Sequence, residues 1–212
     1  GLELRVMKRG ARPDAGGQVV VFRCPVVKAL KPVELLNQGQ VRRVRGVAFA
    51  AKVSPQVPNR LVDAAKGVLL KVPTVAAQSP SLSRGGEAPA LAFSCVPAFI
   101  IERCMCVRAS AQPGQAPEEV GLNAAKLLLH EVRNGGTVDS ANQGLVLMLA
   151  VLCPEDVSRV RLGKLAPQTV RLLRLLRDIF GVVYKIKADT ETKTLVLSCM
   201  GVGYRNMAKG IA

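Results

Sequence analysis

Few side chains in this sequence could do acid–base chemistry. His130 is the only histidine, and it lies near the end of a long expected helix beside Glu131, where an imidazole is normally solvated or stabilised by the helix dipole. Asp139 and Ser140 pair an acid with a hydroxyl, but their segment "GGTVDSANQ" marks a helix start, where such residues cap free N–H groups. The sequence therefore indicates no catalytic acid or base.

The cysteines are the other candidates for chemistry. Most of them sit inside apolar runs and nothing suggests secretion, so we expect reduced core thiols. Cys104 and Cys106, in "CMC", would share one face of a strand and could form half of a metal site. With one histidine and no second close cysteine pair, we expect no metal and no cofactor. The six cysteines are Cys24, Cys95, Cys104, Cys106, Cys153 and Cys199.

The charge balance is more informative than any single residue. The 212 residues include 30 Lys and Arg against 15 Asp and Glu, a formal net charge of +15. Such a field attracts polyanions, with RNA as the first expectation and acidic protein as the second. Aromatic residues make up only 3% and tryptophan is absent, so we expect contacts to phosphates rather than bases stacked on exposed rings.

Two basic clusters lie in the N-terminal quarter of the chain. They are Lys8, Arg9 and Arg12 around a glycine turn, and Arg42, Arg43 and Arg45 at the start of an expected strand. For both clusters, contact with RNA phosphates and a merely solvated face remain open alternatives.

A third group of cations shares one helix. Arg171, Arg174 and Arg177 recur at a spacing of three, which places them on one face. Leu172, Leu176 and Ile179 fall on the opposite face, as in an amphipathic helix. A row of exposed guanidinium groups suits an acidic or phosphate-bearing partner.

These groups must be positioned by an α+β arrangement of elements. Periodicity and turn signals predict strands at 18–27, 41–53, 90–96, 98–109, 157–163, 181–189 and 193–203, and helices at 54–73, 116–136, 137–152 and 167–180. The longest apolar run, Gly144 to Cys153, is far shorter than the roughly 20 residues of a membrane span. We therefore expect no membrane segment.

The order of the expected elements suggests a split domain. From residue 137 onward it is αβαββ, and adding the strand at 18–27 gives βαβαββ if residues 33–133 form an inserted βαβββα domain. We therefore expect residues 1–32 and 134–212 to build one domain around that insert. Strand 18–27 should then share a sheet with 182–187 and 194–199, while 41–47 should lie in a different sheet.

Four stretches of the chain carry a family resemblance. They are "KRGARPDAGGQVVVFRCPVVKALKP", "RVRGVAFAAKVSPQVPNRLVDAAK", "NGGTVDSANQGLVLML" and "LGKLAPQTVRLLRLL". In this order and spacing they resemble the RNA 3'-terminal phosphate cyclase-like proteins, the eukaryotic non-cyclase branch of the cyclase superfamily. The superfamily fold has three βαβαββ repeats with a smaller domain inserted into the third. The resemblance implies that this chain is a C-terminal portion holding the end of the second repeat, the third repeat and the insert.

The resemblance also implies that the cyclase site has been lost. True cyclases use a histidine just before the last helix, and Gln168 stands there in this sequence. A carboxamide nitrogen is not basic and cannot act as that nucleophile. Gly144 and Leu145 stand where the cyclases carry an Asp and a Gln. Two elements of the nucleotide site are therefore expected to be missing.

By resemblance we expect a non-enzymatic ribosome biogenesis factor in the nucleolus. It would join the small-subunit processome, bind a nucleolar GTPase and support early pre-rRNA cleavages, with no membrane and no small-molecule substrate involved. Two alternatives stay open, a pre-rRNA endonuclease and an active RNA 3'-terminal phosphate cyclase that uses residues outside this sequence.

Overall fold

The computed structural model describes residues 3–8, 18–24, 26–39, 41, 43–50, 54, 56–71, 76–77, 83–84, 90–95, 105–111 and 114–207. They fall into two compact units. The first holds β1 (Glu3–Lys8), β2 (Gln18–Arg23), β4 (Arg43–Ala50), α1 (Gln56–Leu69), β5 (Ala76–Ala77), β6 (Ser83–Arg84), β7 (Ala90–Cys95), β8 (Met105–Ser110) and most of α2 (Pro117–Asn134). The second holds β3 (Glu34–Leu35), α3 (Gln143–Val151), β9 (Val157–Leu162), α4 (Pro167–Phe180), β10 (Lys185–Asp189) and β11 (Thr194–Met200).

A five-stranded sheet forms the centre of the first unit. Its order is β5-β4-β7-β8, and β6 also pairs with β4. β4 is parallel to β5 and β6 and antiparallel to β7, which in turn is antiparallel to β8. β1 and β2 form a separate antiparallel pair. The prediction that residues 41–47 belong to a different sheet from 182–187 and 194–199 is confirmed by β4, which lies apart from the sheet of β10 and β11.

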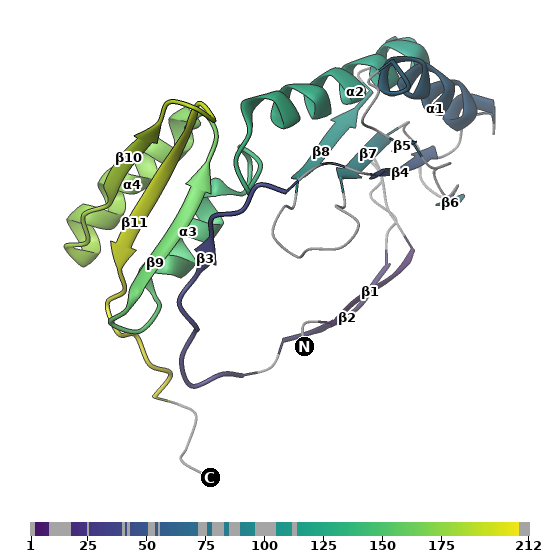
Figure 1. Ribbon diagram of the computed structural model, residues 1–212. Coiled ribbons are helices and arrows are strands. Elements are labelled where there is room, and N and C mark those ends of the chain that lie inside the picture. Colours follow the sequence, from purple (N-terminus) through teal and green to yellow (C-terminus); the bar gives the residue numbers. More distant parts are fainter. Residues whose placement is uncertain are drawn as a thin grey trace. The chain divides into compact units, whose positions relative to one another are not determined.

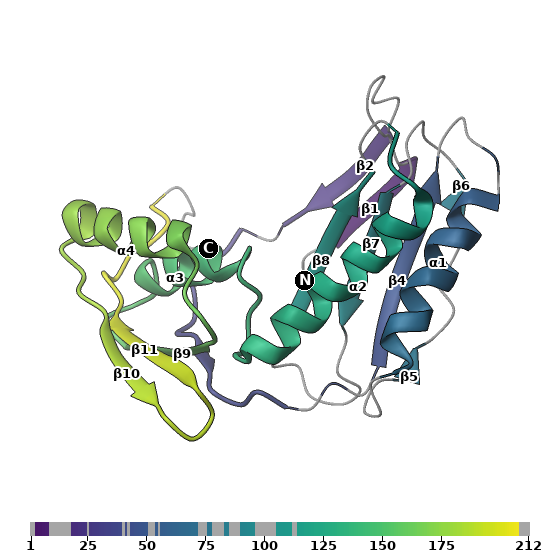
Figure 2. The ribbon, with the colours of Figure 1, turned by 90° about the horizontal axis from the view of Figure 1, so that it is seen from above.

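Helices α1 and α2 lie along the same side of this sheet (Figure 2). Leu61 and Leu69 of α1 and Leu128 of α2 are fully buried in the shared core. The two helices approach closely at Gly121, because a Cβ there would lie 2.3 Å from the main-chain oxygen of Leu61. A hydrogen-bonded ion pair between Arg60 and Glu118 joins the helices at the surface and lowers the pKa of the Glu118 carboxyl.

The second unit is a four-stranded sheet with two helices on one face (Figure 1). The strand order is β10-β11-β9-β3, with β3 parallel to β9 and the other neighbours antiparallel. Leu147 of α3 is buried against Val160 and Leu162 of β9 and Leu197 of β11, and Leu173 of α4 packs against the same cluster. Along the chain the elements run β3, α3, β9, α4, β10, β11, which is a βαβαββ order.

One strand assignment made from sequence is wrong. The strand expected at 18–27 does not join the sheet of β10 and β11. β2 pairs with β1, and the first strand of the βαβαββ unit is β3. β3 has only two residues, too few to show a period. Its place is fixed by the main-chain N–H of Arg159, which donates to the Val33 carbonyl at 2.7 Å. The division of the chain at residues 32 and 133 stays a prediction.

Candidate functional site

Gln168, the position aligned with the cyclase nucleophile, lies in the first turn of α4. Pro167 opens that helix and Ala166 precedes it in an extended conformation. A proline suits this position because the first helical N–H has no partner within the helix. The Gln168 side chain is exposed. Its position at a helix start matches the expectation, and its amide offers no nucleophile.

A buried glutamine beside this position was overlooked in the sequence. Gln143, the first residue of α3, is only 2% exposed. Its Nε2 donates to the Lys164 carbonyl at 3.0 Å, while its Oε1 accepts from the Ala166 N–H at 3.2 Å and from the Thr169 hydroxyl at 2.8 Å. The glutamine therefore fixes the start of α4 to the start of α3. A polar residue directly before the apolar run "GLVLMLAV" was the available signal.

Gly144 and Leu145, the two further positions of the lost cyclase site, follow Gln143 in α3. A Cβ on Gly144 would lie 3.0 Å from Cδ2 of Leu172 in α4, so the helices are close at this point. Leu145 is 53% exposed. The structure thus brings the aligned positions to the same pair of helices. The side chains found there are an exposed amide, a hydrogen atom and an exposed leucine.

Asp139 caps the turn that leads into α3 rather than the helix itself. It is 1% exposed, and one carboxylate oxygen accepts from the Asn142 main-chain N–H at 3.1 Å while the other accepts from the Asn142 amide at 3.0 Å. Such aspartate turns are common before helices. The predicted helix capping by Asp139 is therefore wrong, because the N-cap of α3 is Asn142 and no side chain caps the helix there. His130 is exposed on α2.

The three arginines of α4 lie on its exposed side, as predicted. Arg171, Arg174 and Arg177 are all exposed, and Leu176 on the opposite side is 2% exposed. Ile179, expected beside Leu176 on the apolar face, is instead 64% exposed. Arg177 pairs with the neighbouring Asp178 at 3.0 Å. The stripe is therefore partly neutralised at its C-terminal end.

The N-terminal basic clusters fall largely outside the described part of the chain. Lys8 in β1 and Arg43 and Arg45 in β4 are described by their backbone alone. The remaining members, Arg9, Arg12 and Arg42, lie outside the described residues. Their contact with RNA stays a prediction.

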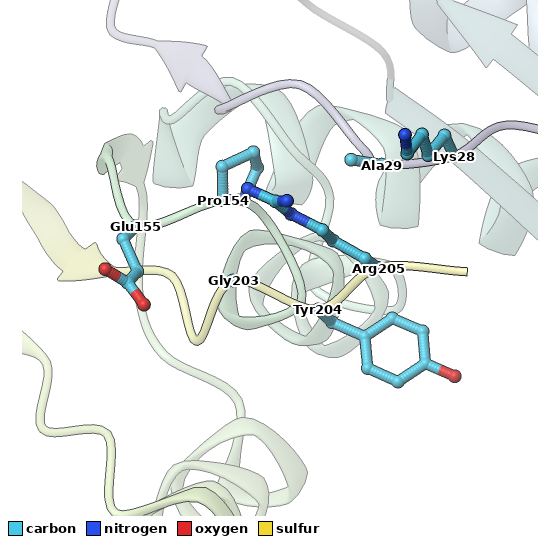
Figure 3. Close-up of a pocket in the computed structure, with 7 residues that line it drawn as sticks. All are labelled: Lys28, Ala29, Pro154, Glu155, Gly203, Tyr204 and Arg205. Carbon is cyan, nitrogen blue, oxygen red and sulfur yellow. The ribbon is translucent and has the colours of Figure 1, made fainter. Parts of the chain in front are cut away.

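A pocket opens at the edge of the second unit (Figure 3). Its volume is about 600 Å³, and it is lined by Lys28, Ala29, Pro154, Glu155, Gly203, Tyr204 and Arg205. Main-chain bonds hold its walls together, from Asn206 N–H to the Lys28 carbonyl at 2.8 Å and from Gly203 N–H to the Cys153 carbonyl at 2.9 Å. Arg205 extends toward Pro154 while the Tyr204 ring points away. Two cations and a carboxylate among the lining residues suit a small polar or anionic group.

The two buried thiols of the second unit are poor nucleophiles. Cys153 and Cys199 are buried and unpaired with each other, and burial raises the pKa of both thiols. Cys153 donates to the Lys31 carbonyl at 2.9 Å. Burial likewise raises the pKa of the Tyr184 hydroxyl, which donates to the Leu147 carbonyl at 2.6 Å. Protonated groups of this kind stabilise the core and do not attack substrates.

The described residues contain neither a metal-binding cluster nor a membrane-spanning helix. Within the described ranges, no cluster of three or more His, Cys, Asp or Glu side chains is arranged to bind a metal ion. Cys104 of the "CMC" pair is not among those residues. No helix in the part of the chain covered by the structure is both long and apolar enough to span a membrane.

Comparison with known proteins adds the relatives of this chain. Residues 36–133 match the family described as RNA 3'-terminal phosphate cyclase (RTC), insert domain. A probable RNA 3'-terminal phosphate cyclase-like protein of Dictyostelium discoideum is 40% identical over 99% of the chain and 61% of its own length. The RNA 3'-terminal phosphate cyclase-like protein of Mus musculus is 38% identical over 98% of the chain and 59% of its own length.

A third relative carries a functional name. An rRNA processing protein of Schizosaccharomyces pombe is 36% identical over 99% of the chain and 59% of its own length. The chain therefore spans about three fifths of the length of the curated relatives it matches. Over the part that it spans, the chain is similar to RNA 3'-terminal phosphate cyclase-like proteins, and residues 36–133 match the insert-domain family.

Proposed function

We propose that this protein takes part in the processing of ribosomal RNA and does so without cyclase chemistry. The observation that carries the proposal is the 36% identity, over 99% of the chain, to a protein named for rRNA processing. The formal net charge of +15 supports it, because a strongly cationic protein concentrates nucleic acid around itself.

Gln168 and its surroundings support the lack of cyclase activity. Nucleophilic catalysis needs a lone pair that can attack and accept a proton, and an amide nitrogen has none available. His130, the only histidine, lies on α2 in the other unit. Gly144 supplies no side chain and Leu145 supplies only an apolar one, so neither replaces an aspartate or a glutamine in binding a nucleotide.

The finer assignment follows from the family resemblance. We place the protein in the nucleolus, in the small-subunit processome, where it would support early pre-rRNA cleavages together with a GTPase. A GTPase partner needs a protein-binding surface, and Arg171 and Arg174 on α4 offer exposed guanidinium groups for acidic side chains. A desolvated Arg–carboxylate pair gives specificity at such an interface.

The test of function is complementation. In cells depleted of the native protein, the full-length protein should restore the normal set of rRNA precursors on hybridisation blots. The Gln168→Ala variant should restore them equally well, because no chemistry runs through that position. Failure of the wild type to restore processing would overturn the proposal.

The test of chemistry is a mass-spectrometric search for AMP covalently attached after incubation with ATP. We expect none in the wild type, and none in Gln168→His, because Gly144 and Leu145 would still leave the nucleotide unpositioned. An AMP adduct on either protein would favour the cyclase alternative. Metal-dependent cleavage of a pre-rRNA spacer would favour the endonuclease alternative.

The test of the partner surface is charge reversal. Arg174→Glu should abolish pull-down of the GTPase, since reversing a desolvated interfacial charge costs several kcal/mol. Lys126→Glu makes the same charge change on the exposed side of α2 and should leave the pull-down intact. If both variants recover the GTPase equally well, α4 does not contribute to the interface with it.

A further inference from the structure

The four-stranded sheet of the second unit has one face that no helix of that unit covers. Alternation along β9 and β11 sends Val160, Leu162 and Leu197 toward α3 and α4. By the same alternation, the residues between them point to the opposite face of the sheet, and both helices lie on the other side (Figure 1). Register places the following residues on this open sheet face: Val157, Arg159 and Arg161 of β9, Lys185, Lys187 and Asp189 of β10, the buried Thr194 with Val196, Ser198 and Met200 of β11, and Glu34 of β3.

Three cations on the open sheet face form no ion pair with any described residue. Arg159, Lys185 and Lys187 are exposed, and no ion pair holds any of them within the part of the chain that the structure describes. Lys185 and Arg159 lie in one cross-strand row, both opposite Ser198 of β11. The chain leaves these charges available to a ligand.

A fourth cation on this face, Arg161, already forms an ion pair. Arg161 Nη1 donates to Asp189 Oδ2 at 2.6 Å and to the Thr194 hydroxyl at 3.2 Å. Glu34 is the second carboxylate of the face and stands beside Arg159 in register, without an ion pair among the described residues. Four cations against two carboxylates leave the open sheet face positive.

The spacing of the free cations makes their fields add. Lys185 and Lys187 are two residues apart on one strand, about 7 Å, and Arg159 is two strands away, about 10 Å. These separations are near the Debye length of about 8 Å at physiological salt. An anion approaching the face therefore interacts with all three charges together.

The chemistry of the face favours a phosphate backbone over an acidic protein. Lysine is depleted at protein–protein interfaces, where aromatic side chains are enriched; here two of the three free cations are lysines, and no aromatic residue stands among the residues that register places on the face. Phosphate contacts, in contrast, are made by Lys and Arg, with hydroxyls such as that of Ser198 as further donors.

We propose that the open sheet face, through Arg159, Lys185 and Lys187, binds the phosphate backbone of RNA without reading its sequence. The inference rests on the proposed function in rRNA processing, because it names a surface by which that function would contact its RNA. It differs from the N-terminal basic clusters predicted from sequence and from the α4 arginines.

Salt dependence of RNA binding tests the proposal directly. Arg159→Ala/Lys185→Ala/Lys187→Ala and wild type, both as the full chain, are titrated with a fluorescent single-stranded RNA of mixed sequence between about 50 and 200 mM salt. Each phosphate contact on a single strand contributes about 0.7 to the logarithmic salt slope, so losing three lowers the slope by about 2. The affinity gap between the two proteins should then narrow by about 20-fold as salt rises from about 50 to 200 mM.

The matched control removes the same number of charges from α4. Arg171→Ala/Arg174→Ala/Arg177→Ala should keep the wild-type slope, because these side chains lie on the helical layer. Circular dichroism melting checks that both triple variants are folded; if the face variant is not, the single variant Lys187→Ala replaces it, with an expected slope change of about 0.7.

Three results would overturn the inference. The first is an unchanged salt slope in the face variant, and the second is an equal loss of slope in the α4 variant. The third is a face variant that no longer binds a poly-glutamate probe but still binds RNA, which would assign the face to an acidic protein. Complementation of rRNA processing is a separate readout. A wild-type protein that binds RNA through this face and fails to restore processing would refute the proposed function alone.

Discussion

Replacing Gln143 by alanine should loosen the start of α4. The side chain is almost completely buried and makes three hydrogen bonds, to the Lys164 carbonyl, the Ala166 N–H and the Thr169 hydroxyl. These groups belong to the segment that enters α4. The variant therefore leaves this segment without these three bonds to α3.

The size of the effect follows from the groups left behind. An unsatisfied buried donor or acceptor costs about 1–3 kcal/mol. Three groups are affected, and water entering the space vacated by the side chain can satisfy part of them. We therefore expect Gln143→Ala to lower the free energy of unfolding by about 3 kcal/mol.

Two neighbouring variants calibrate this value. Thr169→Val removes one hydroxyl and leaves Gln143 Oε1 bonded to the Ala166 N–H, so about 1 kcal/mol should be lost. Gln168→Ala changes an exposed side chain of the same helix turn and should stay within about 0.5 kcal/mol of the wild type.

Hydrogen exchange is the suitable assay because the chain has two compact units. Amides of α4 should exchange faster in Gln143→Ala, with protection reduced by about two powers of ten for a loss of about 3 kcal/mol, while α1 and α2 keep their protection. Unchanged protection in α4, or an equal loss in Gln168→Ala, would refute the role assigned to Gln143.

Further predictions concern the second unit. Arg161 lowers the pKa of Asp189 to about 2, so the stability from this pair is present above about pH 4 and is lost as pH falls toward 2; urea unfolding between pH 5 and 2 should show a shallower decline for Asp189→Asn. Gly136 has φ +89° and a Cβ there would lie 2.4 Å from a main-chain nitrogen, whereas Gly181 has φ +68° and open space around it. Thermal melting should therefore show a much larger loss for Gly136→Ala than for Gly181→Ala. Tyr184→Phe removes the hydroxyl bonded to a carbonyl of α3 and should cost about 1 kcal/mol in urea unfolding.

The long helices could be recognised from the sequence because their signals are local. α2 and α4 each show apolar residues at helical spacing, Pro at the first position and Gly just beyond the end. The α4 arginines followed from the same period, since positions three apart share a face. The βαβαββ order was also visible, because strands at 157–163 and after 181 alternate with these helices.

The first strand of the unit was not visible because its pairing is long-range. β3 is two residues long and is fixed by contacts to β9, about 125 residues further along the chain, including the Ser158 hydroxyl that accepts from the Val33 N–H at 3.1 Å. The more β-branched segment at 18–27 was therefore the stronger local candidate. A strand this short depends on tertiary pairing rather than on propensity.

For the candidate sites, too, some features could be predicted from the sequence and others depend on long-range pairing. Gln168 could be identified by its order among motifs, and the overall charge predicted a polyanionic partner. The Gln143 network and the open sheet face depend on tertiary structure. Gln143 lies more than 20 residues from each group it bonds, and Arg159, Lys185 and Lys187 become neighbours only through strand register. The sequence alone determined which residues carry charge, and the pairing of distant strands decided which charges act together, because a sheet brings residues into contact across it and not along the chain.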